Sequence, residues 1–166
     1  SNTLGVSISY SSSDFPMFVS NVKRDVAPEY QTFTITIPKL KITDAIVAVD
    51  SNDLDRNLAQ LPGTSLPGEK GNLFISGHSN GFIFFSPGNR YKSIFTDLPK
   101  LKEGDEITVT AGSQTFNYKV QGLKIVDPKD TSVISPPDFS GRYISLMTCV
   151  PPGVNTKRLV VLGKLE

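Results

Sequence analysis

The chain of 166 residues has very few side chains that bind metals or form covalent crosslinks. It contains one cysteine, Cys149, and one histidine, His78. A single cysteine excludes an internal disulfide, and there is no His/Cys cluster of the kind that holds structural zinc. The sole cysteine must therefore serve either packing or reactivity.

Long apolar runs and a one-sided charge are missing as well. The sequence has no run of about 20 apolar residues and no signal peptide, so we expect residues 1–166 to be soluble. Lysine and arginine number 17, against 16 aspartates and glutamates. This balance gives no electrostatic reason to expect binding to nucleic acid or to an anionic membrane.

Short segments with strand-like patterns, separated by turns rich in Pro and Gly, make up most of the chain. Alternation, β-branched residues and flanking turns predict strands at 33–37, 40–42, 45–49, 72–76, 106–111, 115–121, 123–126, 142–147 and 158–162. About nine short strands with little helix favour an all-β fold, a closed or nearly closed barrel. We expect residues 31–166 to form this domain and the Ser-rich residues 1–30 to be a flexible or surface-packed leader.

Two segments show helical features. Residues 51–60 offer capping side chains and two leucines on one face, which predicts a helical turn. Residues 91–101 have room for one short helix before the turn at 102–105. The expected barrel therefore carries one or two short helices.

Three residues carry the candidate chemistry. His78 lies just past a buried strand, Cys149 ends a later strand, and Arg158 begins the strand after that. A thiol with an ordinary pKa of about 8.5 becomes a good nucleophile when a neighbouring imidazole or guanidinium favours its thiolate. Arginine can stabilise an oxyanion, and histidine can protonate a departing amine. If the strand ends meet at one rim of the barrel, these side chains are sufficient for acyl transfer.

Other readings of the same residues remain open. A lone cysteine among apolar residues is usually a small buried side chain, so a non-catalytic β-barrel binding module with an inert Cys149 is one alternative. A second is an enzyme like the L,D-transpeptidases, cell-wall enzymes whose catalytic cysteine follows a Ser-His-Gly type of run. Here Thr148 precedes the cysteine and the histidine is far upstream, which disfavours that alternative.

The segment around the cysteine resembles a known family. Residues 145–149 (Ser-Leu-Met-Thr-Cys), followed after eight intervening residues by Arg158, resemble the Thr-Leu-x-Thr-Cys…Arg signature of sortases, the cysteine transpeptidases of bacterial surfaces. Further similar segments occur in family order at 37–42, 61–72, 76–78, 95–107 and 126–128. Together they cover roughly residues 33–163.

The resemblance implies an eight-stranded sortase barrel with Cys149 as nucleophile, His78 as general acid and base, and Arg158 as oxyanion or substrate clamp. It implies cleavage of a Leu-Pro-x-Thr-Gly-like motif at the C-terminal end of surface proteins, through a thioester. The acceptor would be an amine, from a cell-wall precursor or a pilin lysine, with no cofactor and no metal. The full-length protein would be anchored at the extracellular face of the bacterial plasma membrane.

The resemblance also implies where a substrate binds. Loop 127–140 corresponds to the family's specificity loop, in which Val133, Ile134 and Phe139 would contact the Leu-Pro part, while Thr148 would hydrogen-bond near the substrate. The Cys-to-Arg spacing is most similar to pilin-type sortases, and anchoring versus polymerising stays open. Residues 82–85 (Phe-Ile-Phe-Phe) would roof the site, touch a partner or cover the end of the barrel. Pilin-type sortases often carry a lid with Asp-Pro-aromatic, and residues 14–16 (Asp-Phe-Pro), which have these residues in another order, would belong to such a lid.

Overall fold

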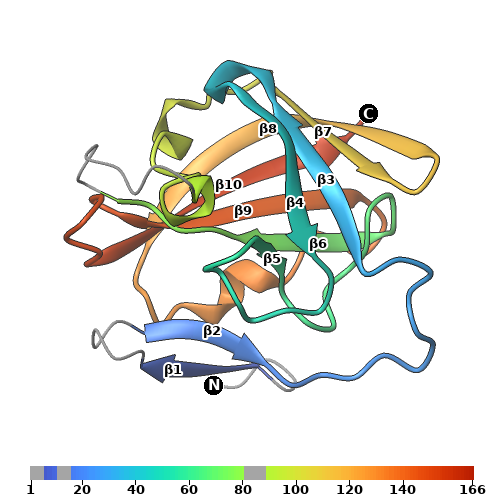
Figure 1. Cartoon of the computed structure of the whole chain (residues 1–166), viewed down its shortest axis with the longest axis horizontal. Helices are drawn as coiled ribbons and strands as arrows, with labels where there is room; N and C mark the ends of the chain where they lie inside the picture. Colours follow the sequence, from blue (N-terminus) through green and yellow to red (C-terminus); the bar gives the residue numbers. More distant parts are fainter. Residues whose placement is uncertain (1–5, 11–15, 81–88) are drawn as a thin grey trace.

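Eight strands close into a barrel (Figure 1). The structure, a computed structural model, describes residues 6–10, 16–80 and 89–166. The barrel strands are β3 (Thr32–Ile37), β4 (Ile42–Ala48), β5 (Leu58–Gln60), β6 (Gly71–Ser76), β7 (Glu106–Ala111), β8 (Gln114–Val126), β9 (Arg142–Val150) and β10 (Lys157–Leu165). Their order is β10-β8-β7-β3-β4-β5-β6-β9, with β9 paired back onto β10. The predicted all-β, eight-stranded barrel is confirmed.

The barrel interior is filled by the apolar members of each alternating pattern. In β3 the buried positions are Phe33, Ile35 and Ile37, and the polar threonines between them face outward. The inward side chains of the strands at the candidate site belong to the same core; they are Leu73, Ile75, Ile144, Leu146, Leu159 and Val161. Residues between them therefore lie on the outer face.

The helices of the described residues are short 3-10 turns. They are η1 (Pro38–Leu40), η2 (Arg90–Lys92), η3 (Leu98–Lys100) and η4 (Thr131–Ile134). Two of these turns replace the one helix predicted over 91–101. No helix among the described segments is long and apolar enough to cross a membrane.

The predicted helical turn over 51–60 is wrong. The Ser51 hydroxyl and the Asp53 carboxylate each accept a hydrogen bond from the backbone N–H two residues further on, at 3.0 and 2.9 Å. Such local bonds compete with helix formation. The last three residues become β5, which pairs with β4 and β6 in the barrel wall.

One long strand replaces two predicted ones. β8 runs straight through the interruption expected between 121 and 123, because a bulge absorbs the extra residue. Leu162 pairs with Gly122 and the next residue, Gly163, pairs with Val120, so Gln121 has no counterpart on β10.

The N-terminal segment forms a separate hairpin of β1 (Val6–Tyr10) and β2 (Pro16–Ser20). Figure 1 shows it in blue alongside the barrel, next to turn η4. Ser20 anchors it: its hydroxyl donates to Pro62 O at 2.7 Å, and its backbone exchanges two hydrogen bonds with the side chain of Asn52. The lid residues Asp14 and Phe15 and the aromatic roof at 82–85 lie outside the described residues.

Candidate active site

Parallel pairing of β6 with β9 brings His78 and Cys149 to the same end of the barrel. Ser76 is opposite Met147 in this pair, and the Gly77 N–H continues the ladder to Met147 O at 3.1 Å. Continuing the register by two residues sets His78 level with Cys149. These residues are 71 positions apart in the chain.

Two side-chain hydrogen bonds extend this connection beyond the end of β6. Thr148 Oγ1 donates to Gly77 O at 2.8 Å, and Ser79 Oγ donates to Cys149 O at 2.6 Å. Gly77 itself fits tightly, since a Cβ there would lie 2.5 Å from Leu58 Cδ2 and 2.7 Å from Phe95 Cδ2. The segment that carries His78 is therefore fixed to the strand that carries Cys149.

Antiparallel pairing of β9 with β10 adds the arginine. Arg158 is directly opposite Cys149, and directly opposed residues in such a pair project to the same face of the sheet. Arg158 is only 2% exposed, and its Nη1 donates to Asn155 O at 2.9 Å and to Lys157 O at 3.0 Å. The loop after β9 thus holds the guanidinium beside the cysteine.

The thiol is subject to two opposing effects. Partial burial raises the pKa of Cys149 above its ordinary value because the thiolate loses solvation, and the charge of Arg158 opposes this rise. The net direction is upward, so most molecules carry the protonated thiol at neutral pH. The reactive thiolate is then a minority form.

The side chain of His78 contacts a carboxylate, that of Asp55. His78 Nε2 lies 3.0 Å from Asp55 Oδ1, which comes from the loop between β4 and β5. Sequence reasoning missed Asp55, because nothing in residues 51–60 indicates a partner 23 residues later in the chain. It also missed Ser79, whose position next to the sole histidine was the only available signal.

An apolar surface leads away from the three residues along the outside of the barrel. Phe74, Met147 and Val160 alternate with core positions of β6, β9 and β10, and Val133 and Ile134 of η4 pack on them. The amide of Asn72 holds this turn by donating to Ile134 O at 3.0 Å. We call these five apolar residues the outer apolar surface.

The other two residues expected to bind substrate differ in exposure. Phe139 lies on the same loop as η4 but is 87% exposed, outside the outer apolar surface. Thr148 is 2% exposed, and its hydroxyl is engaged by Gly77. Its role at the site is therefore to hold the backbone that positions His78.

The N-terminal hairpin covers the outer apolar surface. Val6 and Phe18 belong to the same buried cluster as its five residues and Leu61. The rings of Phe18 and Phe74 lie 6.1 Å apart, tilted by 43°. A peptide could reach this part of the surface only where the hairpin does not lie.

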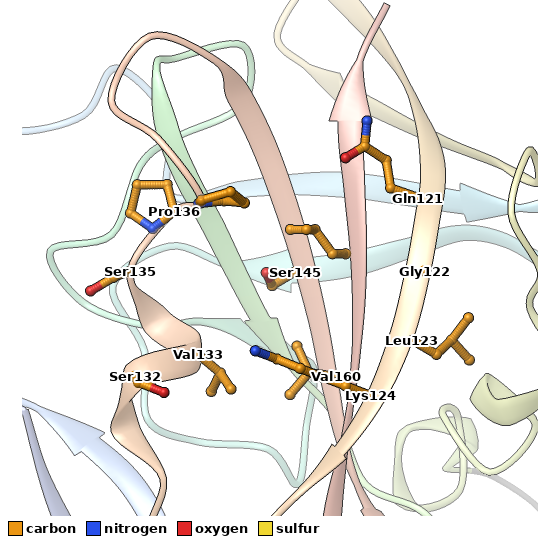
Figure 2. A pocket seen from close by; sticks show the side chains of 12 residues that line it. Gln121, Gly122, Leu123, Lys124, Ser132, Val133, Ser135, Pro136, Ser145 and Val160 are labelled. Carbon is orange, nitrogen blue, oxygen red and sulfur yellow. The ribbon is translucent and has the colours of Figure 1, made fainter.

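A pocket of about 600 Å³ lies beside the loop that carries η4 and shares Val133 and Val160 with the outer apolar surface. Figure 2 shows it between this loop and strands β8 and β10, with the side chain of Lys124 extending from β8 toward Val133 of η4. Its walls include Leu123, Val133 and the two prolines Pro136 and Pro137. The residues that line it do not include His78, Cys149 or Arg158, so it is separate from the candidate chemistry.

The aspartates of loop 127–140 accept hydrogen bonds mainly from backbone N–H groups of the same loop. Asp127 and Asp130 each accept from the N–H two residues further on, and Asp138 accepts from Gly141 N at 2.7 Å and from Tyr143 OH at 2.6 Å. Within residues 6–10, 16–80 and 89–166, no group of three or more potential metal ligands comes together.

Comparison with known proteins assigns the chain to a family. The model of the sortase domain matches residues 35–166. The chain belongs to the sortase family, which consists in general of cell-wall sorting transpeptidases with a catalytic cysteine. The predicted family is thereby confirmed, which decides against the L,D-transpeptidase alternative.

Similar proteins come from several bacteria. Sortase D of Bacillus subtilis is 28% identical over 134 residues, which are 78% of this chain and 61% of the relative. The structure of a lid mutant of sortase A from Corynebacterium diphtheriae has a TM-score of 0.71 and 28% identity, covering 84% of this chain and 72% of that one. A sortase D5 transpeptidase of Clostridium perfringens gives 0.69 and 27%, covering 82% and 79%. The chain spans less than two thirds of the length of the curated relatives that it matches.

Proposed function

We propose that this protein is a cysteine transpeptidase that cleaves a Leu-Pro-x-Thr-Gly-like sorting motif and transfers the new acyl end to an amine. The observation that carries the proposal is the position of Cys149 on β9, between the segment that follows β6 and the start of β10. One strand thus has the histidine on one side and the arginine on the other. Family membership supports the same chemistry.

The reaction follows from the roles of the three side chains. The thiolate of Cys149 attacks the carbonyl carbon of the motif threonine, and the guanidinium of Arg158 stabilises the negative oxygen that develops. The C–N bond breaks as the His78 imidazolium gives its proton to the departing amine, which leaves a thioester on Cys149. An acceptor amine then attacks the thioester, loses its proton to His78 and releases the thiolate.

The outer apolar surface is the proposed site for the Leu-Pro part of the motif. It begins two residues from Cys149, at Met147, and includes Val133 and Ile134 of the loop, so it offers apolar side chains to a short apolar peptide segment. Phe139 would contribute from the exposed rim of the same loop. Thr148 would act beside the substrate through its hold on the His78 segment.

The partners follow from the proposed reaction and the family. The acyl donors would be surface proteins with a C-terminal sorting motif, and the acceptor a cell-wall precursor or a pilin lysine. We propose that the full-length protein acts at the extracellular face of the plasma membrane, where both reactants occur.

We further propose that residues 1–30 act as a lid made of this chain's own hairpin. Val6 and Phe18 occupy part of the outer apolar surface, so the hairpin and a substrate peptide would compete for it. The related C. diphtheriae structure is described as a lid mutant, so that sortase also has a lid.

A fluorogenic sorting-motif peptide tests the proposal. We expect the wild type to cleave it and the Cys149→Ala variant to be inactive at an unchanged melting temperature. Mass spectrometry of the wild type with peptide and no amine should show one acyl adduct, on the only cysteine. Turnover by Cys149→Ala, or an adduct at another residue, would contradict the assignment of the nucleophile.

One observation favours the alternative of an inert binding module, namely the raised pKa of Cys149. An inert, buried cysteine should resist a thiol-selective alkylating reagent in the folded protein. We expect the reagent to label Cys149 in the folded protein, because the side chain is only partly buried and Arg158 opposes the rise of its pKa. Failure of the reagent to label the folded chain would support the binding module.

A further inference from the structure

The carboxylate of Asp55 lies beside His78, the proposed general acid and base. Asp55 Oδ1 and His78 Nε2 are 3.0 Å apart, and the histidine side chain is 33% exposed against 76% for the aspartate. The two residues come from different loops, since Asp55 follows β4 and His78 follows β6. Their contact therefore depends on how the barrel places these loops.

The backbone of Asp55 is held from two sides. Its N–H donates to Asp53 Oδ1 at 2.9 Å, and its carbonyl accepts from Asn89 Nδ2 at 2.8 Å. Asn89 in turn caps turn η2 by accepting from Tyr91 N at 3.0 Å. The aspartate is thus presented to the histidine by fixed backbone, unlike a typical exposed ion pair between two long and mobile side chains.

The bond determines how the imidazole carries its proton. An ionised carboxylate can only accept hydrogen bonds, so Nε2 of His78 bears the hydrogen in this pair. In the neutral ring, Nδ1 is then the nitrogen with a free lone pair.

We propose that Asp55 is a positioning residue for His78: through the bond to Nε2 it fixes the ring so that Nδ1 exchanges the proton with Cys149 and the leaving amine. The proposal rests on the proposed function for its link to peptide cleavage. In the step concerned, the proton passes from Sγ of Cys149 to Nδ1 of His78. Asp55 takes no part in this proton transfer and only holds the ring in place.

Because the chain has one cysteine and one histidine, the rate of alkylation by iodoacetamide at neutral pH reports this pair without any substrate. We expect Asp55→Asn to slow alkylation of Cys149 about two- to fivefold, the range for an exposed charged pair. Glu103→Gln, which removes one exposed carboxylate from the turn before β7, is the matched control and should leave the rate unchanged.

A double-mutant cycle tests whether Asp55 acts through His78. In a His78→Ala background, Asp55→Asn should have no further effect on alkylation. An equal slowing in both backgrounds, or a rate for Asp55→Asn equal to that of Glu103→Gln, would overturn the proposal. Melting temperatures of all variants exclude loss of fold as the cause.

Peptide cleavage provides the second readout. Asp55→Asn should lower kcat by a similar factor and leave KM unchanged, and Asp55→Glu should recover part of the loss because it keeps a carboxylate. A change confined to KM would contradict positioning of the acid and base. If the wild type cleaves no sorting-motif peptide while the alkylation cycle holds, the proposed function fails and the role of Asp55 stands.

Discussion

At the scale of single residues, the central quantity is the small thiolate population of Cys149. Burial raises the pKa of the thiol, and Arg158 works against burial. The arginine therefore has two proposed effects, since it increases the thiolate in the free enzyme and stabilises the oxyanion during the reaction. The first effect can be measured without substrate.

Replacing Arg158 by glutamine should make the thiol less acidic. Removal of the guanidinium leaves burial unopposed, so the pKa of Cys149 rises further. The rate of alkylation follows the thiolate fraction and increases with pH, and its midpoint should move to higher pH in Arg158→Gln. Lys157→Gln removes the exposed neighbouring cation and is the control. A midpoint that stays in place or moves downward would show that Arg158 does not act on the sulfur.

At the scale of elements, the β1–β2 hairpin and turn η4 form one apolar cluster on the outer face of the barrel. Burial of one phenylalanine side chain contributes roughly 1.5–3 kcal/mol. A substrate that needs the same surface must compete with that contribution. If the sorting motif binds as proposed, the strength of this contact limits its affinity.

Phe18→Ser should weaken the hairpin's hold while Ser20 keeps its bonds to Asn52 and Pro62. We expect KM for the peptide to fall severalfold, up to about tenfold, with little change in kcat, because only access to the surface changes. Val26→Ser alters an 80% exposed apolar residue of the same leader and should have no effect. A KM that is unchanged or raised in Phe18→Ser would mean that the hairpin does not compete with substrate.

At the scale of the whole molecule, the carboxylate of Asp138 links acid stability to loop 127–140. Hydrogen bonds from Tyr143 and from the backbone of Gly141 lower the pKa of Asp138 from 3.8 to about 2. A carboxylate with a lowered pKa in the folded state stabilises the fold above its unfolded value, near pH 4. That contribution disappears as the pH falls from about 4 toward 2.

Asp138→Asn should accordingly destabilise the protein at pH 6 and much less at pH 3. The difference in denaturant midpoint between wild type and variant should be constant from pH 7 to about 5 and should shrink on acidification. Asp25→Asn, which removes an exposed carboxylate of the leader, serves as the comparison. A difference that grows as the pH falls would have the wrong sign for this linkage.

The barrel and its three candidate residues could be predicted because their signals are local. Alternation in segments such as 33–37 indicates strands, and the run around Cys149 is specific for one family. The prediction was wrong where hydrogen bonds or strand pairing, rather than the residue pattern, determined the secondary structure. Ser51 and Asp53 bond to their own backbone, which a pattern of two leucines does not reveal, and the bulge at Gln121 depends on pairing with β10. The contact of Asp55 with His78 depends on the closed barrel, so no short segment encodes it.

The insertion of β9 between β6 and β10 has a consequence for biogenesis. Before that single strand docks, the sulfur lies beside neither the segment of His78 nor Arg158, and it is only an ordinary thiol. Docking of β9 therefore brings the three candidate residues together in one step. A nascent or misfolded copy in which β9 is unpaired lacks the assembled site.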